Sequence, residues 1–293
     1  MPRQRAKMTA PAQESGIELA TARMKPETLA QRLRAGKTMV GTLITSTSPV
    51  CAQAVAASGL DFVFLDTEHI PLDRAQLGWM CQAYARMGLP PLVRVPSPDP
   101  FAATMALDVG AGGIIAPYIE SAAQVRTMAG AVKFRPVKGE RLARRLNGEL
   151  FEPALEDYLH RRNVEPLIVN IESVPAILAL DDILAVPELD AVLIGPHDLS
   201  CSLGLPEQYE HPEFLRACEK ILRLARAAGL GAGIHFFGPP EAMARFHSMG
   251  ANLLIHASDL ALFQRALCGD LQTLRALCGL GNWGPAKPTE LHT

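Results

Sequence analysis

Two carboxylates in this chain each follow a short apolar run. Glu172 ends the run at residues 167–172, and Asp198 follows the run at residues 191–194. An acid at the end of a buried strand is costly unless a positive group meets it, so two such acids on adjacent strands suggest a shared cation. Oxygen ligands without cysteine or an HExxH motif favour Mg²⁺ or Mn²⁺, with Co²⁺ as a further option. We predict that both acids ligate a divalent metal; the alternative is that each forms a salt bridge.

Other polar side chains follow other apolar runs, and strand ends carry the working residues of barrel enzymes. Arg94 has a planar guanidinium, which suits a carboxylate or carbonyl oxygen; the alternative is an ion pair with Asp66 or Glu68. His69 could act as a general base because histidine titrates near neutrality, although a lone loop histidine is commonly exposed or a helix cap. Asp108 could orient that imidazole, or could be an ordinary acid at a helix end.

The bulk composition limits the classes of function. The 293 residues are 48% hydrophobic and 20% charged, with a formal net charge of −2, so the chain can bury a barrel-sized core. This charge gives no basic field for nucleic acid or anionic lipid. No apolar run reaches the roughly 20 residues of a membrane span, and no secretory segment follows the start. We therefore expect a cytoplasmic protein that binds a small molecule, not nucleic acid or membrane.

Strand-like and helix-like segments alternate from residue 25 onward. The expected strands are apolar on both faces, which is typical of a parallel sheet covered on both sides; they are residues 39–44, 62–66, 92–95, 113–116, 167–172, 191–194, 231–236 and 252–256. The expected helices are residues 73–87, 100–109, 122–132, 174–184, 212–228, 239–249 and 260–278. This alternation predicts a single-domain (β/α)8 barrel over residues 25–280. The alternative, an open doubly wound sheet, lacks a glycine-rich phosphate motif after its first strand.

Three segments fall outside this alternation. Residues 1–24 are expected to form a flexible tail, and residues 281–293 a second tail. Residues 134–165 are rich in charge and are expected to form a long loop with one short helix near residues 153–161. A loop this long in a compact barrel is commonly functional. We expect it to cover the mouth of the barrel.

A covalent mechanism is disfavoured by the placement of the lysines. A Schiff-base aldolase needs a buried lysine at a strand end. No lysine lies at the end of a predicted strand; the seven are Lys7, Lys25, Lys37, Lys133, Lys138, Lys220 and Lys287. His235 and His256 do lie near strand ends, and we interpret them as core or rim histidines without a role.

Several strings of this chain together resemble the HpcH/HpaI aldolase family, the class II pyruvate-type aldolases related to the citrate lyase β-subunit. The strings follow in collinear order across residues 38–260, and Asp-x-Glu-His and Gly-Pro-x-Asp-Leu are the more specific ones. They lie at residues 61–69, 92–96, 106–114, 171–173, 189–200 and 202–204. The resemblance implies a (β/α)8 barrel that forms a homo-oligomer, often a hexamer whose C-terminal helix is exchanged between partners.

The resemblance also assigns roles to residues at the matching positions. Glu172 and Asp198 would ligate the metal, Arg94 would bind the oxygens of the keto acid, and His69 with Asp108 would form an acid/base dyad. Asp66 would hold the neighbouring site residues in place. The backbone at Gly195, Pro196 and His197 would bind the substrate carboxylate.

The implied reaction is reversible aldol cleavage of a 4-hydroxy-2-oxo acid to pyruvate and an aldehyde, through a metal-stabilised enolate. One departure from the family pattern is that residues 134–142 replace the common Pro-Pro-x-Gly-x-Arg-Gly segment. Their extra basic residues would suit a more anionic partner. The first alternative is therefore a citrate-synthase-like condensation of acetyl-CoA with oxaloacetate, as in a siderophore-biosynthesis branch of the family. The second is a non-catalytic barrel that binds a keto acid.

Overall fold

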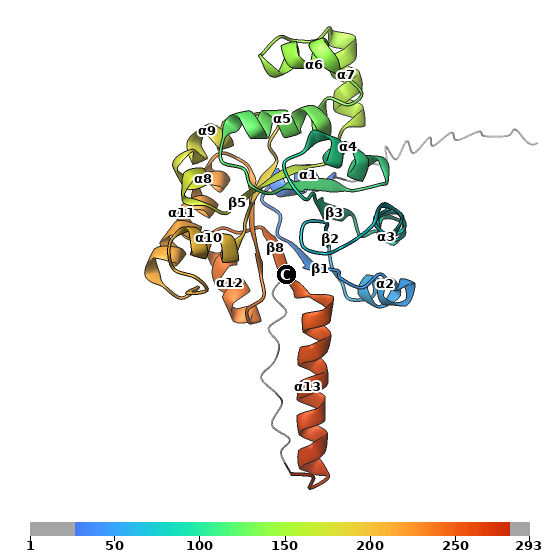
Figure 1. Ribbon diagram of the computed structural model, residues 1–293, viewed down its shortest axis with the longest axis vertical. Helices are drawn as coiled ribbons and strands as arrows, with labels where there is room; N and C mark the ends of the chain where they lie inside the picture. Colours follow the sequence, from blue (N-terminus) through green and yellow to red (C-terminus); the bar gives the residue numbers. More distant parts are fainter. Residues whose placement is uncertain (1–26, 282–293) are drawn as a thin grey trace, which may run out of the picture.

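Eight apolar segments of the chain form parallel strands that close into a barrel in sequence order (Figure 1). The computed structural model describes residues 27–281, so both expected tails lie outside the described residues, apart from residue 281. The strands are β1 Met39–Leu43, β2 Phe62–Asp66, β3 Pro91–Arg94, β4 Gly113–Ala116, β5 Leu167–Ile171, β6 Ala191–Ile194, β7 Gly231–Phe236 and β8 Leu253–Ser258. The closed parallel barrel that the sequence predicts is confirmed.

Helices surround this barrel and cover the outer faces of its strands. In the described residues they are α1 Leu29–Arg34, α2 Pro49–Ala56, α3 Arg74–Arg86, α4 Pro100–Asp108, α5 Ala122–Lys133, α6 Gly139–Leu146, α7 Pro153–Arg162, α8 Val174–Leu178, α9 Leu180–Leu184, α10 Pro196–Ser202, α11 Pro212–Ala227, α12 Pro240–Ser248 and α13 Asp259–Leu277. The expected helix over residues 174–184 divides at Ala179 into α8 and α9. The short helices α1, α2, α6 and α10 were not expected.

Alternation along each strand separates an interior core from an outer one. Phe62, Phe64 and Ile168 belong to the cluster inside the barrel. The residues between them, such as Val63 and Val169, pack in the outer cluster, which includes the surrounding helices. Toward the carboxyl ends of the strands, the next inward-facing positions hold polar side chains instead of apolar ones. These inward polar residues are Asp66, Arg94, Asn170, Glu172 and His235, and all of them are buried.

The amino end of the barrel is closed by α1. Leu29 and Leu33 of this helix complete the interior cluster. The Asn252 side chain fixes the helix to the sheet, because its Nδ2 donates to the Leu33 carbonyl at 2.9 Å and its Oδ1 accepts from the Ala232 amide at 2.8 Å. With this end filled, the open end of the barrel is the carboxyl end, where the polar side chains lie.

Residues 134–165 fold into α6 and α7 and lie at the amino end of the barrel, on the opposite side of the molecule from α13 (Figure 1). Lys133 Nζ lies 2.7 Å from Asp190 Oδ2, and the same carboxylate oxygen accepts from the amide of Leu167, the first residue of β5. The expected cover over the barrel mouth is therefore wrong. A segment that leads from a helix to the next strand lies at the amino end, whereas the mouth is built from strand-to-helix connections.

Helix α13 begins at the carboxyl end of β8 and extends away from the barrel (Figure 1). It has no buried residue, and its large apolar side chains are exposed at a spacing of three or four residues. They are Leu260, Phe263, Leu267, Leu271, Leu274 and Leu277. This spacing places them along one face of the helix. No helix in residues 27–281 is long and apolar enough to cross a membrane.

Candidate active site

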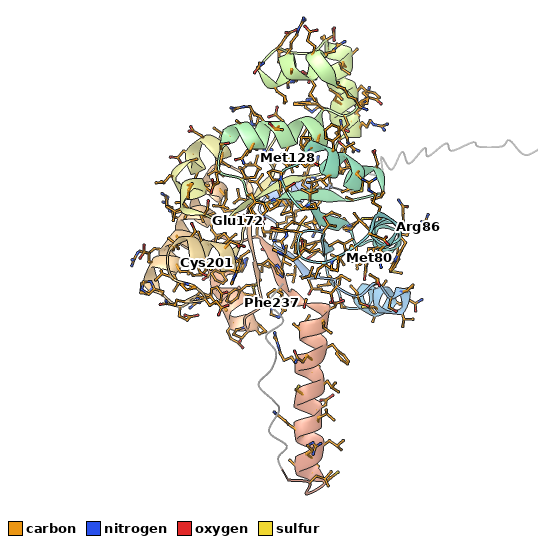
Figure 2. The ribbon with its side chains drawn as sticks, in the orientation of Figure 1. Met80, Arg86, Met128, Glu172, Cys201 and Phe237 are labelled. Carbon is orange, nitrogen blue, oxygen red and sulfur yellow. The ribbon has the colours of Figure 1, made fainter. Side chains whose placement is uncertain are left out.

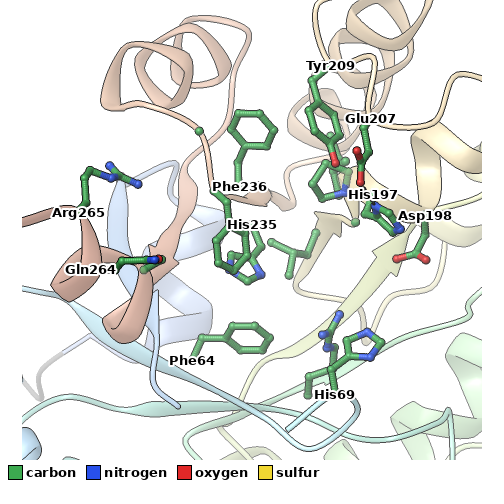
Figure 3. A pocket seen from close by; sticks show the side chains of 18 of the residues that line it. Phe64, His69, His197, Asp198, Glu207, Tyr209, His235, Phe236, Gln264 and Arg265 are labelled. Carbon is green, nitrogen blue, oxygen red and sulfur yellow. Dashed lines mark ion pairs between the residues drawn. The ribbon is translucent and has the colours of Figure 1, made fainter. Parts of the chain in front are cut away.

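A cavity of about 1110 Å³ opens at the carboxyl end of the barrel, between the strand ends and α13. Glu207 and Tyr209 lie on one side of it, and Gln264 and Arg265 of α13 lie on the other (Figure 3). Phe64 contributes an apolar surface between them. The predicted site residues that line this cavity are His69, Arg94, Gly195, Pro196, His197 and Asp198.

The two predicted metal ligands lie against the same glycine. Glu172 follows the last residue of β5 and lies inside the ring of helices (Figure 2), and Asp198 lies in the first turn of α10. A Cβ atom placed on Gly195 would lie 2.9 Å from Glu172 Oε2 and 3.7 Å from Asp198 Oδ2. The structure therefore brings these two carboxylates together. Because Gly195 has no side chain, the space between its backbone and both acids stays open.

The Glu172 carboxylate is held by two hydrogen bonds. Its Oε1 accepts from the Tyr118 amide at 2.6 Å, and its Oε2 accepts from Asn170 Nδ2 at 2.8 Å. Tyr118 has a φ of 55°, and a backbone in this left-handed region is strained for a residue other than glycine. Such strain is commonly retained where function requires a particular geometry. Here the tight turn positions an amide that orients one acid.

Three carboxylates crowd this end of the barrel. Burial raises the pKa of Glu172, and the negative charges of Asp198 and Glu68 raise it further, against the hydrogen bonds from Tyr118 and Asn170. The Tyr118 hydroxyl donates to Glu68, and this hydrogen bond together with burial raises the pKa of Tyr118 to about 12. One oxygen of Glu68, Oε2, is buried without a hydrogen bond and lies 3.1 Å from Arg94 Nε, the cation that it shares with Asp66. The site thus holds more negative charge than its own donors neutralise.

This arrangement fits a hard divalent cation. Glu172 and Asp198 offer oxygen ligands, which Mg²⁺ and Mn²⁺ prefer, and the hydrogen bonds to Glu172 orient it as outer partners of metal ligands do. No group of three or more histidine, cysteine, aspartate or glutamate side chains in residues 27–281 is arranged to hold a metal ion. A cation here would therefore take two protein ligands and complete its coordination with water and substrate.

Arg94 is fully engaged on one side by Asp66. Its Nε donates to Asp66 Oδ1 at 2.8 Å and its Nη2 donates to Asp66 Oδ2 at 2.6 Å, and its Nε also lies 3.1 Å from Glu68 Oε2. Both acids are buried with it. The alternative ion pair that the sequence suggests is therefore present. Arg94 nevertheless lines the cavity, so the pair fixes the guanidinium at the wall where a substrate oxygen would lie.

His69 lies beside Glu68, not beside Asp108. Its Nε2 is 3.7 Å from Glu68 Oε1, and its side chain is partly exposed to the cavity. Asp108 is the last residue of α4, at the amino end of the barrel, where it forms an ion pair with Arg135 Nη1 at 3.2 Å. The predicted His69–Asp108 dyad is therefore wrong within one chain, because the end of a barrel helix lies opposite the strand ends.

The position of Arg135 corrects a second expectation. The basic residues of the 134–142 segment were expected to suit an anionic substrate, but Arg135 pairs with Asp108 and lies 4.0 Å from Glu165 at the amino end. No residue of this segment lines the cavity. Within one chain, these cations cannot select the substrate.

Four residues near the site were not assigned a role from the sequence. They are Glu68, Tyr118, Asn170 and His235. Asn170 and His235 could have been found as polar residues at inward positions of otherwise apolar strands. Glu68 stands in the Asp-x-Glu-His string but was considered only as a partner of Arg94. Tyr118 holds Glu172 through its main-chain amide, for which side-chain chemistry gives no signal.

We expect Gly195→Ala to lower kcat/KM by about 10²-fold, because the new methyl group would displace the Glu172 carboxylate from its position. The free energy of unfolding should fall by only about 1–2 kcal/mol. Steady-state kinetics and urea denaturation measure the two effects. Gly78→Ala is the matched control, since a Cβ at this position in α3 meets nothing closer than 3.8 Å. Full activity of Gly195→Ala would show that this contact does not position Glu172.

Comparison with known proteins connects this geometry to a family. The family model described as HpcH/HpaI aldolase/citrate lyase matches residues 15–266. The chain is 33% identical over 234 residues to 2-keto-3-deoxy-L-rhamnonate aldolase of Klebsiella pneumoniae, with 79% of this chain and 87% of that protein covered.

Solved structures agree with this match. An HpcH/HpaI aldolase from Desulfitobacterium hafniense DCB-2 superposes with a TM-score of 0.75 and 29% identity, covering 87% of this chain and 99% of that chain. Citrate synthase SbnG superposes with a TM-score of 0.74 and 28% identity, covering 86% and 99%. The similarity therefore covers most of the chain, and the family model spans all eight strands of the barrel.

Proposed function

Because this chain belongs to the HpcH/HpaI aldolase/citrate lyase family, we propose that it is a divalent-metal-dependent aldolase that cleaves a 4-hydroxy-2-oxo acid to pyruvate and an aldehyde, and catalyses the reverse addition. The observation that carries the proposal is the convergence of Glu172, Asp198, Arg94 and His69 at the open end of the barrel. Among the described lysines none lines the cavity, which agrees with a mechanism without a Schiff base.

Glu172 and Asp198 are the proposed metal ligands. A bound Mg²⁺, Mn²⁺ or Co²⁺ would supply a Lewis acid that stabilises negative charge on the oxygens of the keto acid. Glu172 is oriented for this role by Tyr118 and Asn170. Gly195, Pro196 and His197 line the cavity beside Asp198, and we assign the binding of the substrate carboxylate to their backbone.

Arg94 stabilises the oxyanion that develops at the keto oxygen. Its Nε and Nη2 are committed to Asp66, so the guanidinium is held in one orientation before the substrate arrives. A donor that does not need to reorganise stabilises a transition-state charge more effectively than a mobile one. Asp66 is in this sense a positioning residue, since it is fully buried and acts through Arg94.

His69 transfers the proton. In the cleavage direction it accepts the proton of the C4 hydroxyl as the C3–C4 bond breaks, and the electron pair of that bond moves into the enolate of pyruvate. The His69 imidazolium then gives this proton to C3 of the enolate, which forms pyruvate and returns His69 to its neutral state. The Glu68 carboxylate, 3.7 Å from His69 Nε2, stabilises the imidazolium between these two steps.

We propose that the exposed apolar face of α13 packs against another copy of the chain. The family resemblance implies a homo-oligomer with an exchanged C-terminal helix, and this face is the surface such an exchange would bury. The hexameric state and the cytoplasmic location stay predictions.

The test is a pair of assays on the full chain with Mn²⁺ or Mg²⁺. Pyruvate release from 4-hydroxy-2-oxo acids supports the proposal, and its loss with EDTA supports the metal dependence. Release of free thiol from acetyl-CoA and oxaloacetate, without any pyruvate release, would replace it with the citrate-synthase-like condensation. Tight binding of a keto acid with neither reaction would indicate a non-catalytic barrel.

A further inference from the structure

His235 is a buried polar group at the cavity that the proposed mechanism does not use. It lies at an inward position of β7 and lines the cavity beside Phe64 (Figure 3), as Arg94 also does. Its ring centroid is 5.3 Å from that of Phe64, and the Arg94 guanidinium lies 5.5 Å from the same Phe64 ring. Phe64 thus lies next to both Arg94, at the keto-acid end of the site, and His235.

One nitrogen of His235 is fixed by the backbone. Nε2 lies 3.1 Å from the Ala257 carbonyl, which can only accept, so Nε2 carries the proton. Burial lowers the pKa of His235 to about 4, so the imidazole is neutral at neutral pH. In a neutral ring with a protonated Nε2, the other nitrogen, Nδ1, is a hydrogen-bond acceptor. No partner for Nδ1 occurs among the described residues.

The backbone that fixes His235 is irregular. In the β1–β8 ladder, Gly41 pairs with Ile255 and Leu43 pairs with Ser258, so β8 carries one extra residue opposite Thr42. Ala257 lies in this bulge with a φ of 53°, a strained conformation for alanine. Bulges beside active sites commonly redirect a local group. Here the bulge directs a carbonyl at His235 Nε2 and thereby determines which nitrogen is free to accept.

An apolar residue would fill the space among Phe64, Phe237 and the strand ends without burying a polar group. The imidazole ring lies 4.9 Å from the Phe237 ring, so its faces already meet aromatic neighbours. His235 Nδ1 is not among the enclosed side-chain atoms that lack a hydrogen-bond partner. Because it has no partner among the described residues and His235 lines the cavity, Nδ1 is reached from the cavity, where a ligand can supply a donor.

We propose that His235 determines substrate specificity by accepting a hydrogen bond at Nδ1 from a hydroxyl group on the aldehyde half of the substrate. The inference rests on the proposed aldolase function and adds a specificity-determining residue: His235 recognises an aldehyde that carries a hydroxyl group near its carbonyl carbon. With its keto-acid half at Arg94, the substrate extends over Phe64, and the hydroxyl meets His235 beyond the bond that is made or broken.

The experiment compares aldehydes of similar size in aldol addition to pyruvate, with and without a 2-hydroxyl group. The pairs are glycolaldehyde against acetaldehyde, and lactaldehyde against propanal. The measured quantity is the ratio of kcat/KM for the hydroxylated to the plain aldehyde. Comparing this ratio between wild type and variant cancels the different intrinsic reactivities of the two aldehydes.

His235→Leu should lower this ratio by about 10–100-fold, since it removes an acceptor from a buried polar contact. His235→Asn should restore most of the ratio, because the asparagine amide oxygen can occupy the place of Nδ1. His247→Leu is the matched control: His247 also bonds a backbone carbonyl, that of Ala251 at 2.8 Å, but it lies on α12 outside the cavity. Its ratio should equal that of the wild type.

Exchange of the pyruvate methyl protons with D₂O, followed by NMR, distinguishes failure of the His235 assignment from failure of the proposed aldolase function. Wild-type exchange in the presence of Mn²⁺ or Mg²⁺ supports the aldolase function without involving any aldehyde. If the wild type exchanges these protons but folded His235→Leu and His235→Asn both keep the wild-type ratio, the role of His235 is overturned. If the wild type shows no exchange, the proposed function fails, and the specificity assignment fails with it.

Discussion

Glu172→Gln is expected to lower kcat/KM by about 10³-fold or more, because a neutral amide cannot replace an anionic ligand of the metal that stabilises the enolate. The substitution is nearly isosteric, and its oxygen can still accept from the Tyr118 amide. Pyruvate release under saturating Mn²⁺ measures the effect. Metal-dependent activity at the wild-type level in this variant would contradict the assignment of Glu172.

The same variant should not be less stable than the wild type when metal is removed. The pKa of Glu172 is raised by burial and by the charges of Asp198 and Glu68. An acid whose pKa is raised in the folded state loses its contribution to stability as the pH rises, so at neutral pH its charge opposes folding. Urea denaturation in EDTA should therefore give Glu172→Gln an equal or higher free energy of unfolding. Glu188→Gln, at the amino end beside Arg145, is the control for both measurements.

Arg94→Met is expected to damage both activity and stability. Catalysis should fall by about 10²–10³-fold, because a preorganised donor to the oxyanion is lost. The free energy of unfolding should fall by about 3–5 kcal/mol, because Asp66 is left buried without its partner. Steady-state kinetics and urea denaturation at neutral pH measure the two losses. Arg94→Lys should recover little of the activity, since an ammonium group cannot make the bidentate contact.

The surface offers a matched pair for this test. Arg245 also makes a bidentate contact, with Glu210 at 2.6 and 2.7 Å, but both side chains are largely at the surface. Arg245→Met should therefore cost about 1 kcal/mol or less and leave activity intact. Equal stability losses for the two variants would show that burial of the Arg94–Asp66 pair has no special consequence.

The stability loss in Arg94→Met should depend on pH. Burial alone would raise the pKa of Asp66, but the hydrogen bonds and charge of Arg94 hold it below its usual value. An acid with a lowered folded-state pKa contributes stability above its unfolded pKa, about 3.9 for aspartate, and loses it as the pH falls through the folded value. Without Arg94, burial raises the pKa of Asp66, and its charged carboxylate then lowers stability at neutral pH. The difference in the free energy of unfolding between wild type and variant should therefore narrow as the pH falls toward about 4.

The barrel could be predicted from the sequence because its strands are buried on both faces. The bounds of β2, β4, β6 and β7 agree with the expected segments at both ends. Helix α6 was missed because its apolar face consists of Leu142 and Leu146, which pack on Gly130 of α5 within a strongly basic segment. Two apolar side chains give too little periodicity to indicate a helix.

The site residues that lie at or just after strand ends could be predicted from the sequence. Arg94 and the Glu172–Asp198 pair follow apolar strands, and the structure brings them to one end of the barrel. Within one chain Asp108 lies at the opposite end of the barrel, because it ends α4; this agrees with the alternative that it is an ordinary acid at a helix end. The carbonyl that fixes His235 Nε2 depends on a bulge at Ala257, and a bulge leaves no periodic trace in the sequence.

The most direct test of the central claim is an anomalous difference map at the manganese edge from crystals soaked with Mn²⁺ and pyruvate. We predict one strong peak within bonding distance of both Glu172 and Asp198, with further coordination completed by the keto acid and water. A map with no peak between these carboxylates, from crystals of protein that is active in the same buffer, would contradict the claim that they hold the catalytic metal.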